Sequence, residues 1–449
     1  MERTYYPLSA SQQIVRLQTM MTLFKRVGNI MFALTLDNPL DRSAMTRAIE
    51  MEFDRIDSLR TRFVKKDGQL VQYFDDKGSA GKIREVTFRS QSDQKKFINS
   101  FRKGMLDPAK GQTMKVVFAT DQEGRDVIFI KISHFVADTY AIGVIVTDLF
   151  GVYEALKSGT ALPAAPGAFE PVLRKDTEFL GNEELLAKDR TFYEEYYANS
   201  HPEPPMYCGL HGNSSDVWLA CKKKGKFSIP FRFIKCDTEG YRFIIPAAVV
   251  KEVLAWCEKE AVTPANFFYF SYALACSLRN DRAKYQHALM LLNSRSTVAE
   301  KKCAGTKVQS VGLYTTVDYD KSFAQNIKDM VAEQTEQYRH TRMSYVDVQQ
   351  LQHKVWGHSA LTQVDGFCYS FIPFKSPAGV SMQVHSNGKG ALTGYVALMF
   401  NPDTLEVEAV YDVQRDMTAP AELAEFQNIL VSSIEKVLAS PDSRLAEIL

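Results

Sequence analysis

The sequence lacks an excess of charge of either sign. It contains 54 Lys and Arg residues against 53 Asp and Glu residues, so its formal net charge is +1. A protein that binds nucleic acid through a strong positive field carries a large basic excess, so this balance argues against a nucleic-acid partner. The densest basic stretch, residues 222–224 with Lys226, is short and predicts a solvated turn.

Paired cysteines and metal-binding motifs are also missing. The seven Cys residues are odd in number, widely spaced and form no CxxC pair. This pattern is typical of reduced thiols in a cytoplasmic protein, and it argues against a disulfide framework. The eight His residues form no HExxH motif, so we expect no metal site.

Long apolar runs and a leader-like N-terminus are absent as well. The opening residues, MERTYYPLSASQQ, contain no basic region followed by an apolar stretch, so we expect no signal peptide. No run approaches the ~20 apolar residues that a membrane span requires. We therefore expect a cytoplasmic protein without a membrane partner.

The chain does contain ample material for a folded core. Of its 449 residues, 45% are apolar and 24% are charged, which are ordinary values for a globular protein. In the first part, apolar periodicity predicts strands at 27–36, 69–74, 81–88, 114–119 and 127–132, and helices at 42–53 and 140–156. Residues 157–171, rich in Pro, Ala and Gly, predict a linker.

The remaining part repeats this mixture. Thr263 before Pro264 is a typical helix start, with an N-cap hydroxyl and Pro at the first helical position. Other predicted helices are 246–260, 323–338 and 419–439, and predicted strands are 227–233, 241–245, 288–292, 310–317, 364–372, 381–385, 392–401 and 405–411. The whole pattern predicts an α/β protein with mixed sheets and two lobes, 1–170 and 171–449.

The most informative segment is DVIFIKISHFVADTYAIGVIVTDLF, residues 126–150. A buried strand leads into a short turn with His134 and Asp138, and a helix leaves the turn. A His at such a position can accept a proton near neutral pH, because its ordinary pKa is about 6.5. The residues alone leave a second interpretation open: His134 is a core histidine, and Asp138 only caps the helix.

Ser133 next to His134 suggests a serine nucleophile, but the local pattern argues against it. Adjacent residues of a strand point to opposite faces, so the two side chains should not meet. No GxSxG motif surrounds the serine.

Several segments together resemble the motifs of nonribosomal peptide synthetase condensation domains. SHFVADT, residues 133–139, resembles their HHxxxDG motif, and YYPLSASQQ and RIDSLRTRF, at 5–13 and 55–63, resemble their first motif and LRTxF. Weaker likenesses follow in the same order: FYEEYY (192–197), Asn293-Ser294-Arg295, VGLYTTV (311–317) and HTRMSYVDV (340–348). The order and spacing hold over essentially the whole chain.

The resemblance implies a fold similar to chloramphenicol acetyltransferase, with two mixed α/β lobes in a V-shaped pseudo-dimer. It implies that substrate tunnels meet at His134, which would position or deprotonate the attacking amine or hydroxyl. Asp138 would be structural at the active site, ion-paired with Arg295, or alternatively with Arg62. The substrate arm would be the phosphopantetheine thioester of a carrier protein, with no tightly bound cofactor.

The sequence departs from the family pattern at two motif positions. Ser133 replaces the first His, which is not the family's base, and Thr139 replaces the last Gly. A Cβ at Thr139 would narrow the acceptor side and restrict the backbone. In the second lobe, Thr315 stands where the family has Asn, and we expect it at a tunnel.

These observations predict a stand-alone condensation-like acyltransferase that forms an amide or an ester. Its partners would be an acyl- or peptidyl-carrier protein and a small amine or alcohol, with donor activation supplied by other chains. Two alternatives remain: an acyltransferase that uses free coenzyme A, and a catalytically degenerate module that only recruits a carrier or partner enzyme. Retained His134 and Asp138 favour catalysis, whereas Ser133, Thr139 and Thr315 favour divergence.

Overall fold

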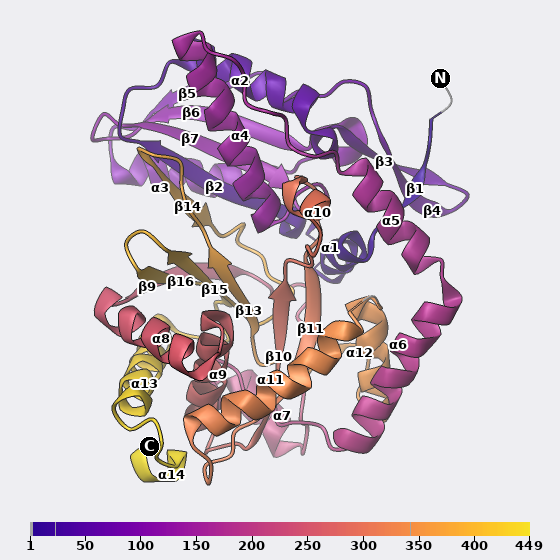
Figure 1. Cartoon of the computed structure of the whole chain (residues 1–449), viewed down its shortest axis with the longest axis vertical. Coiled ribbons are helices and arrows are strands. Elements are labelled where there is room, and N and C mark those ends of the chain that lie inside the picture. The colour runs from indigo at the N-terminus through magenta and orange to yellow at the C-terminus, as the bar shows by residue number, and fades with distance from the viewer. Residues whose placement is uncertain (1–2, 23, 342) are drawn as a thin grey trace. The chain divides into compact units, whose positions relative to one another are not determined.

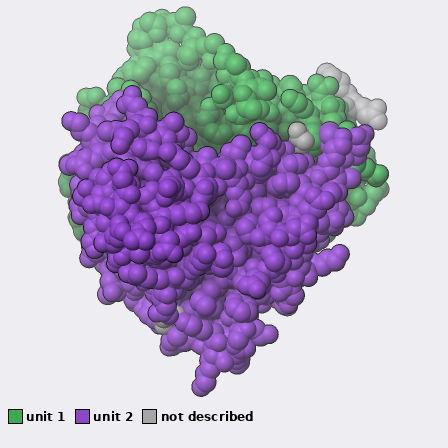
Figure 2. Space-filling model, turned by 60° about the horizontal axis from the view of Figure 1, so that its bottom comes forward, with its two compact units in different colours: residues 1–183, 293–308, 375–389 green, residues 184–292, 309–374, 390–449 purple. Residues whose placement is uncertain are grey.

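The computed structural model describes residues 3–22, 24–341 and 343–449 (Figure 1). Arg342, in the expected 340–348 motif, lies outside the described residues. The chain forms two compact units (Figure 2). Unit 1 contains Met1–Glu183, Asn293–Val308 and Lys375–Lys389, and unit 2 contains Glu184–Leu292, Gln309–Phe374 and Gly390–Leu449. Both units combine helices with mixed or antiparallel sheets, so the predicted fold class is confirmed.

The composition of the units adds a feature that the sequence analysis did not anticipate. Residues 293–308 and 375–389, which we expected in the C-terminal lobe, pack with unit 1. The lobe limits 1–170 and 171–449 themselves stay a prediction.

A five-stranded sheet organises unit 1. Its order is β14 (Val380–His385), β2 (Asn29–Leu36), β7 (Asp126–Ser133), β6 (Met114–Thr120) and β5 (Arg84–Thr87). All neighbouring strands are antiparallel except β5 and β6, which are parallel. The strand that precedes the SHFVADT segment is therefore the central strand of the sheet.

Both faces of this sheet are covered. Ile128, Ile130 and Ile132 of β7 pack with apolar side chains of α2 (Arg42–Arg55) and α4 (Thr139–Ser158). Val127 and Phe129 lie on the opposite face, in a cluster with side chains of α3 (Gln91–Lys103). Burial on both faces explains why 27–36 and 127–132 read as continuous apolar runs.

Helix α4 combines length with an apolar composition. By these two criteria it is the one helix in the described part of the chain that could cross a membrane. Our expectation that no apolar run approaches the length of a membrane span therefore does not hold for α4. However, 56% of its most apolar window is buried inside the structure, which is typical of a core helix.

The rest of unit 1 consists of a small sheet and several helices and turns. A three-stranded sheet has the order β1 (Tyr6–Pro7), β4 (Gln69–Phe74) and β3 (Thr61–Lys66). The remaining helices of the unit are α1 (Ala10–Met21), α5 (Glu170–Leu180), α10 (Val298–Lys302) and the short turns η1 (Lys25–Gly28), η2 (Asp57–Arg60) and η3 (Pro108–Lys110).

Unit 2 is built on a six-stranded mixed sheet. Its order is β11 (Gln309–Thr316), β10 (Tyr285–Leu292), β13 (Cys368–Pro373), β15 (Gly394–Asn401), β16 (Glu406–Gln414) and β9 (Thr238–Ile245). One hydrophobic cluster joins this sheet to α8 (Ala247–Glu260), α9 (Pro264–Arg279), α11 (Phe323–Arg339) and α13 (Pro420–Ala439). As predicted, α9 begins at Pro264, and the Thr263 side chain caps it.

Short elements complete unit 2. These are the pair β8 (Ile229–Pro230) and β12 (Thr362–Gln363), with α6 (Glu183–Glu195), η4 (Tyr196–Ser200), η5 (Gly212–Ser214), α7 (Asp216–Lys223), α12 (Tyr345–Val355) and α14 (Leu445–Ile448). Several predicted strands are shorter than expected: 227–233 retains only β8, 364–372 forms a regular strand only from Cys368, and in unit 1 the strand predicted at 81–88 is limited to β5. The chain bends at Gly366, which lies directly against the carbonyl of Cys208, where a Cβ would approach within 2.0 Å.

Candidate functional site

The segment between β7 and α4 is a tight strand–turn–helix connection, as predicted. Ser133 is the last residue of β7, and its carbonyl accepts hydrogen bonds from the backbone N–H groups of Val136 and Ala137 at 3.0 and 3.2 Å. The His134 N–H donates to the Gly28 carbonyl at 2.7 Å. The backbone that presents the histidine is thus fixed on both sides.

His134 has the properties of a neutral base. Its side chain is half-buried, and its Nδ1 atom is buried and makes no hydrogen bond within the described part of the chain. Burial lowers the pKa of His134, and this effect outweighs Asp138 and the backbone groups of His134 and Ala137, which act in the opposite direction. The imidazole is therefore uncharged near neutral pH and can accept a proton.

Asp138 performs both of the tasks that the sequence left open. It is the N-cap of α4, where its Oδ1 accepts the Ala141 N–H at 2.8 Å. Its two carboxylate oxygens also accept hydrogen bonds from Arg295 Nη2 at 3.0 and 2.9 Å, and Oδ2 accepts the Lys307 N–H at 2.7 Å. The expected partner Arg295 is present, and the alternative, Arg62, instead pairs with Asp75 at 3.2 Å.

Arg295 connects the loop to the segment 293–308. Its side chain is fully buried, and it donates further hydrogen bonds to the carbonyls of Asn293 and Gly305. Its guanidinium carbon lies 4.6 Å from the centre of the Tyr140 ring. A buried cation with this many partners holds the start of α4 and the segment together.

Two further residues support the loop, and we did not predict a role for either. Gln12 Nε2 donates to the Phe135 carbonyl at 3.0 Å and to Gln72 Oε1 at 2.7 Å. Lys307 Nζ lies 2.9 Å from Asp176 and 3.4 Å from Glu300. A sequence signal exists for Gln12, because Ser9 and Gln12 form the capping box of α1; Lys307 has no comparable local pattern.

The remaining candidate residues lie as follows, and their functional roles stay predictions. Ser133 is buried, and its Oγ accepts a long hydrogen bond of 3.4 Å from the Phe135 N–H. Thr139 is the first residue of α4, and it is not among the described residues with positive φ, so its Cβ imposes no backbone strain. Thr315 lies in β11 of unit 2, where its Oγ1 is 3.0 Å from the Tyr269 hydroxyl.

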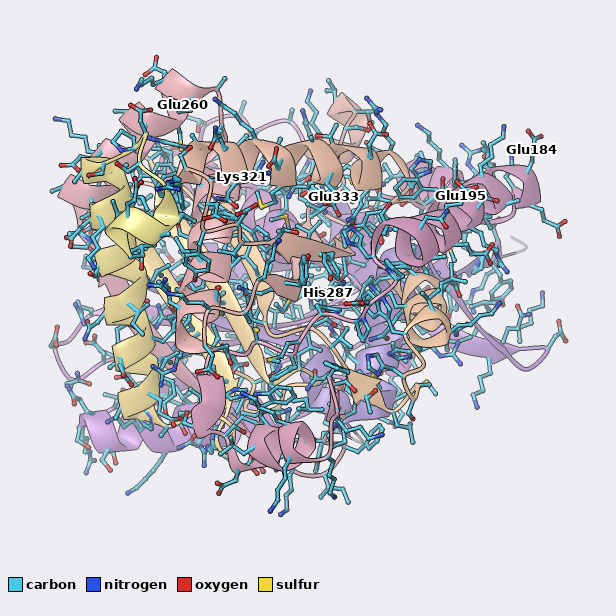
Figure 3. The ribbon with its side chains drawn as sticks, turned by 90° about the horizontal axis from the view of Figure 1, so that it is seen from below. Glu184, Glu195, Glu260, His287, Lys321 and Glu333 are labelled. Atoms are coloured by element: carbon cyan, nitrogen blue, oxygen red, sulfur yellow. The ribbon has the colours of Figure 1, made fainter. Side chains whose placement is uncertain are left out.

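Unit 2 contains a fully buried His–Asp pair, His287 with Asp365. His287 Nδ1 lies 2.9 Å from Asp365 Oδ1, and the side chains are 0% and 1% exposed (Figure 3 labels His287). The Tyr345 hydroxyl donates to both Asp365 oxygens, and His287 Nε2 is 3.0 Å from Gln352 Nε2. Because the pair is enclosed and its polar atoms are engaged, it serves the core of unit 2 and gives a substrate no access.

The metal-binding groups and thiols of the described residues also bear on the requirements of a reactive site. Within residues 3–22, 24–341 and 343–449, no group of three or more His, Cys, Asp or Glu residues is arranged to hold a metal ion. All seven cysteines are free thiols. Burial raises the pKa of Cys208 and of Cys257 to about 12, so these thiols stay protonated and unreactive.

Comparison with known proteins identifies a family. A family model described as "Condensation domain" matches residues 2–364. One of the proteins that make up linear gramicidin synthase in Brevibacillus parabrevis is 31% identical over 166 residues, which cover 36% of this chain and 2% of that protein. The chain thus spans a small part of the length of the synthetase that it matches.

Solved structures show the same fold over the whole chain. The first condensation domain of the calcium-dependent antibiotic synthetase, in complex with a substrate analogue, matches with a TM-score of 0.81 and 15% identity, over 99% of both chains. A variant of the starter condensation domain of rhizomide synthetase, in complex with C8-CoA, matches with a TM-score of 0.80 and 16% identity, over 99% of this chain and 98% of that one.

Proposed function

The chain belongs to the condensation domain family, and from this premise we propose that it is an acyltransferase that forms an amide or an ester. The donor is an acyl thioester on the phosphopantetheine arm of an acyl- or peptidyl-carrier protein. The acceptor is a small amine or alcohol. The family match and the synthetase relatives support a carrier-bound donor. A cytoplasmic location is part of the proposal.

The observation that carries this proposal is the state of His134. The imidazole is uncharged near neutral pH, and its buried Nδ1 is not engaged by a carboxylate within the described residues. In the proposed step, the acceptor N or O attacks the thioester carbonyl while His134 takes the proton from the attacking group. The new C–N or C–O bond forms, the C–S bond breaks, and the proton passes to the departing thiolate. General-base catalysis of this kind contributes about 10²–10⁴-fold.

Asp138 and Arg295 are positioning residues in this scheme. The Asp138 carboxylate is occupied by Arg295, by the Ala141 N–H and by the Lys307 N–H, so it is committed to the scaffold and not to orienting the imidazole. We assign Ser133 and Thr139 to the acceptor side of His134 and Thr315 to a channel in unit 2.

Two other functions make different predictions from the same site. Free coenzyme A thioesters are a possible donor, because one related domain was solved with C8-CoA bound. The other alternative function is a module that recruits a carrier and does not catalyse, because Ser133 and Thr139 depart from the family motif.

The test compares the wild type with His134→Ala and Ser133→Ala. Each protein is incubated with an acyl-loaded carrier protein and a pool of amines and alcohols, and new products are detected by mass spectrometry. We expect His134→Ala to fold normally and lose about 10²–10⁴-fold in rate, and Ser133→Ala to stay close to the wild type. Equal turnover by wild type and His134→Ala would show that the chemistry is not centred on His134.

A parallel reaction replaces the loaded carrier with the matching acyl-coenzyme A. Faster product formation from the carrier supports the proposed donor, and faster formation from coenzyme A contradicts it. If the wild type binds the carrier but turns over neither donor, the protein recruits and does not catalyse.

A further inference from the structure

The face of the unit 1 sheet that carries α3 contains a pocket, which is lined from β5, β6, β7 and α3. Its volume is about 300 Å³. Apolar and cationic side chains line it: Val86, Phe97, Phe101, Arg84, Lys115 and Lys131. This volume lies at the lower end of the range for small-molecule sites, ~300–1,000 Å³, so the pocket suits a small ligand.

Strand register places all three cations on one face of the sheet. Lys115 of β6 and Lys131 of β7 are directly opposite each other in the antiparallel ladder. Arg84 of β5 pairs with Val117, which lies two residues from Lys115 and so points to the same side. Like charges directly opposite on a sheet are destabilising, so this arrangement needs a compensating group.

No carboxylate supplies that compensation within the described residues. The pocket has no Asp or Glu in its lining, and neither Arg84 nor Lys115 forms an ion pair there. Glu85, the neighbour of Arg84, alternates to the other side of β5 and pairs with Arg42. The positive charge of the pocket is therefore unbalanced by the protein.

Lys131 brings this charge into the apolar interior. The residue is 2% exposed, and its Nζ donates to the carbonyls of Phe101 and Gly104 at the C-terminal end of α3. Its Nζ also lies 4.4 Å from the centre of the Phe101 ring. Burial, with a smaller effect from Lys115, lowers the pKa of Lys131 to about 8, so most of the ammonium groups remain charged near neutral pH. The helix carbonyls hold this ammonium but only partly neutralise it.

We propose that this pocket binds a small organic anion: a carboxylate or phosphate ester with a short apolar body. The anionic group pairs with Arg84, Lys115 and Lys131, and the apolar body packs against Phe97, Phe101 and Val86. The site is separate from His134 and from the proposed acyl transfer. It gives the protein a second ligand, whose binding does not depend on the transfer reaction.

The test measures binding to the full chain by isothermal titration calorimetry with two probes, octanoate and phenyl phosphate. Two ligands that each lack one feature are the comparisons: 1-octanol has no charge, and inorganic phosphate has no apolar body. We expect at least one probe to bind more tightly than either comparison ligand. Failure of both probes to bind at millimolar concentration overturns the proposal, and so does equally tight binding of 1-octanol.

Variants then locate the binding site. Arg84→Gln and Lys115→Gln change exposed side chains, and each should weaken binding of the probe about tenfold, the equivalent of one charge-assisted hydrogen bond. Lys95→Gln is the matched control, because Lys95 is an exposed cation of α3 outside the pocket lining. We expect less than a twofold change for it.

The buried cation needs its own check, because replacing it can alter folding. Lys131→Met keeps an unbranched side chain, and its melting curve shows first whether it is folded; a folded variant should lose probe binding. His134→Ala should bind the probe like the wild type. If His134→Ala abolishes binding while Arg84→Gln and Lys115→Gln retain it, the probe occupies another site and the proposal is wrong.

Discussion

Arg295 Nη2 lies 2.9 and 3.0 Å from the two carboxylate oxygens of Asp138, across a sequence separation of 157 residues. Both side chains are buried, so each depends on the other for its counter-charge. The pair fixes the N-terminal end of α4, and with it the turn that carries His134.

Asp138→Ala should therefore destabilise unit 1 strongly. Removing one partner of a buried ion pair typically costs ~3–5 kcal/mol, because the remaining charge is stranded. The matched control is Asp41→Ala: Asp41 also caps a helix, accepting the Ala44 N–H at 2.9 Å, but it is exposed and has no ion pair in the described residues. Loss of a cap alone costs ~0.5–2 kcal/mol. Equal changes in melting temperature for the two variants would mean that Asp138 acts only as a cap.

The pH dependence of the transfer reaction should reflect the lowered pKa of His134. A general base works in its uncharged form, which is lost only when the pH falls through the pKa of the folded protein. Because burial lowers that pKa, the acid limb of kcat/KM should lie below the ordinary His value of about 6.5. The measurement is a pH–rate profile with the loaded carrier. Ser133→Ala should keep this limb and His134→Ala should lack it, whereas a limb at or above the ordinary value would contradict an uncharged buried base.

Glu52 makes the stability of unit 1 depend on pH in the opposite direction from a paired carboxylate. Burial, followed by the influence of Asp148, raises its pKa to about 9, so the folded protein holds a proton that the unfolded chain releases above pH ~4.5. The contribution of Glu52 to the free energy of unfolding is fully favourable below that value, and it is lost progressively as the pH rises towards about 9. Glu52→Gln avoids this loss and should stabilise the protein by up to ~3 kcal/mol near pH 7.

The measurement is the melting temperature of Glu52→Gln and wild type at pH values from 5 to 9, and the difference should grow with pH. Glu50→Gln is the control, since Glu50 is exposed on the same helix. A difference that does not change with pH, or that Glu50→Gln reproduces, would rule out the proton on Glu52 as its source.

Thr139 provides a test of the acceptor side. Its backbone is helical, so Thr139→Gly should relieve no strain and Thr139→Ser should be close to neutral. If Thr139 lines the acceptor side, as we propose, Thr139→Leu adds bulk there, and overpacking of this kind costs ~1–3 kcal/mol. We expect the KM for the acceptor to rise tenfold or more, with little change in hydrolysis of the donor thioester. An equal effect on both measurements would place Thr139 away from the acceptor.

Local patterns in the sequence were enough for most of the regular elements. The strand predicted at 69–74 is β4 with the same limits, and the helix predicted at 323–338 is α11, Phe323–Arg339. In α11 the buried residues recur at helical spacing, which produces a clear period. Helix α3 escaped prediction because Phe101 is its only fully buried residue, so its apolar pattern is sparse.

The candidate site also combines residues that the sequence revealed with residues that it did not. His134 and Asp138 were visible because strand, turn and helix follow one another within 126–150. Arg295 was predicted only from the family resemblance, and the contact of the Lys307 backbone N–H was not predicted. Both contact Asp138 from more than 150 positions away, and a contact of that range leaves no periodic trace in the sequence.

Unit 1 can be completed only late in synthesis. It includes residues 293–308 and 375–389, which follow parts of unit 2 in the sequence. Strand β14 covers β2, so β2 is an open edge until His385 has been made. At ~5–20 residues per second, the roughly 200 residues between the end of the first segment and β14 take on the order of 10–40 s to translate. Throughout that interval most of unit 2 emerges while unit 1 is incomplete, and the two cannot fold strictly one after the other. The edge of β2 in the nascent chain is thus open to edge-to-edge pairing throughout that interval, as a consequence of the topology of unit 1.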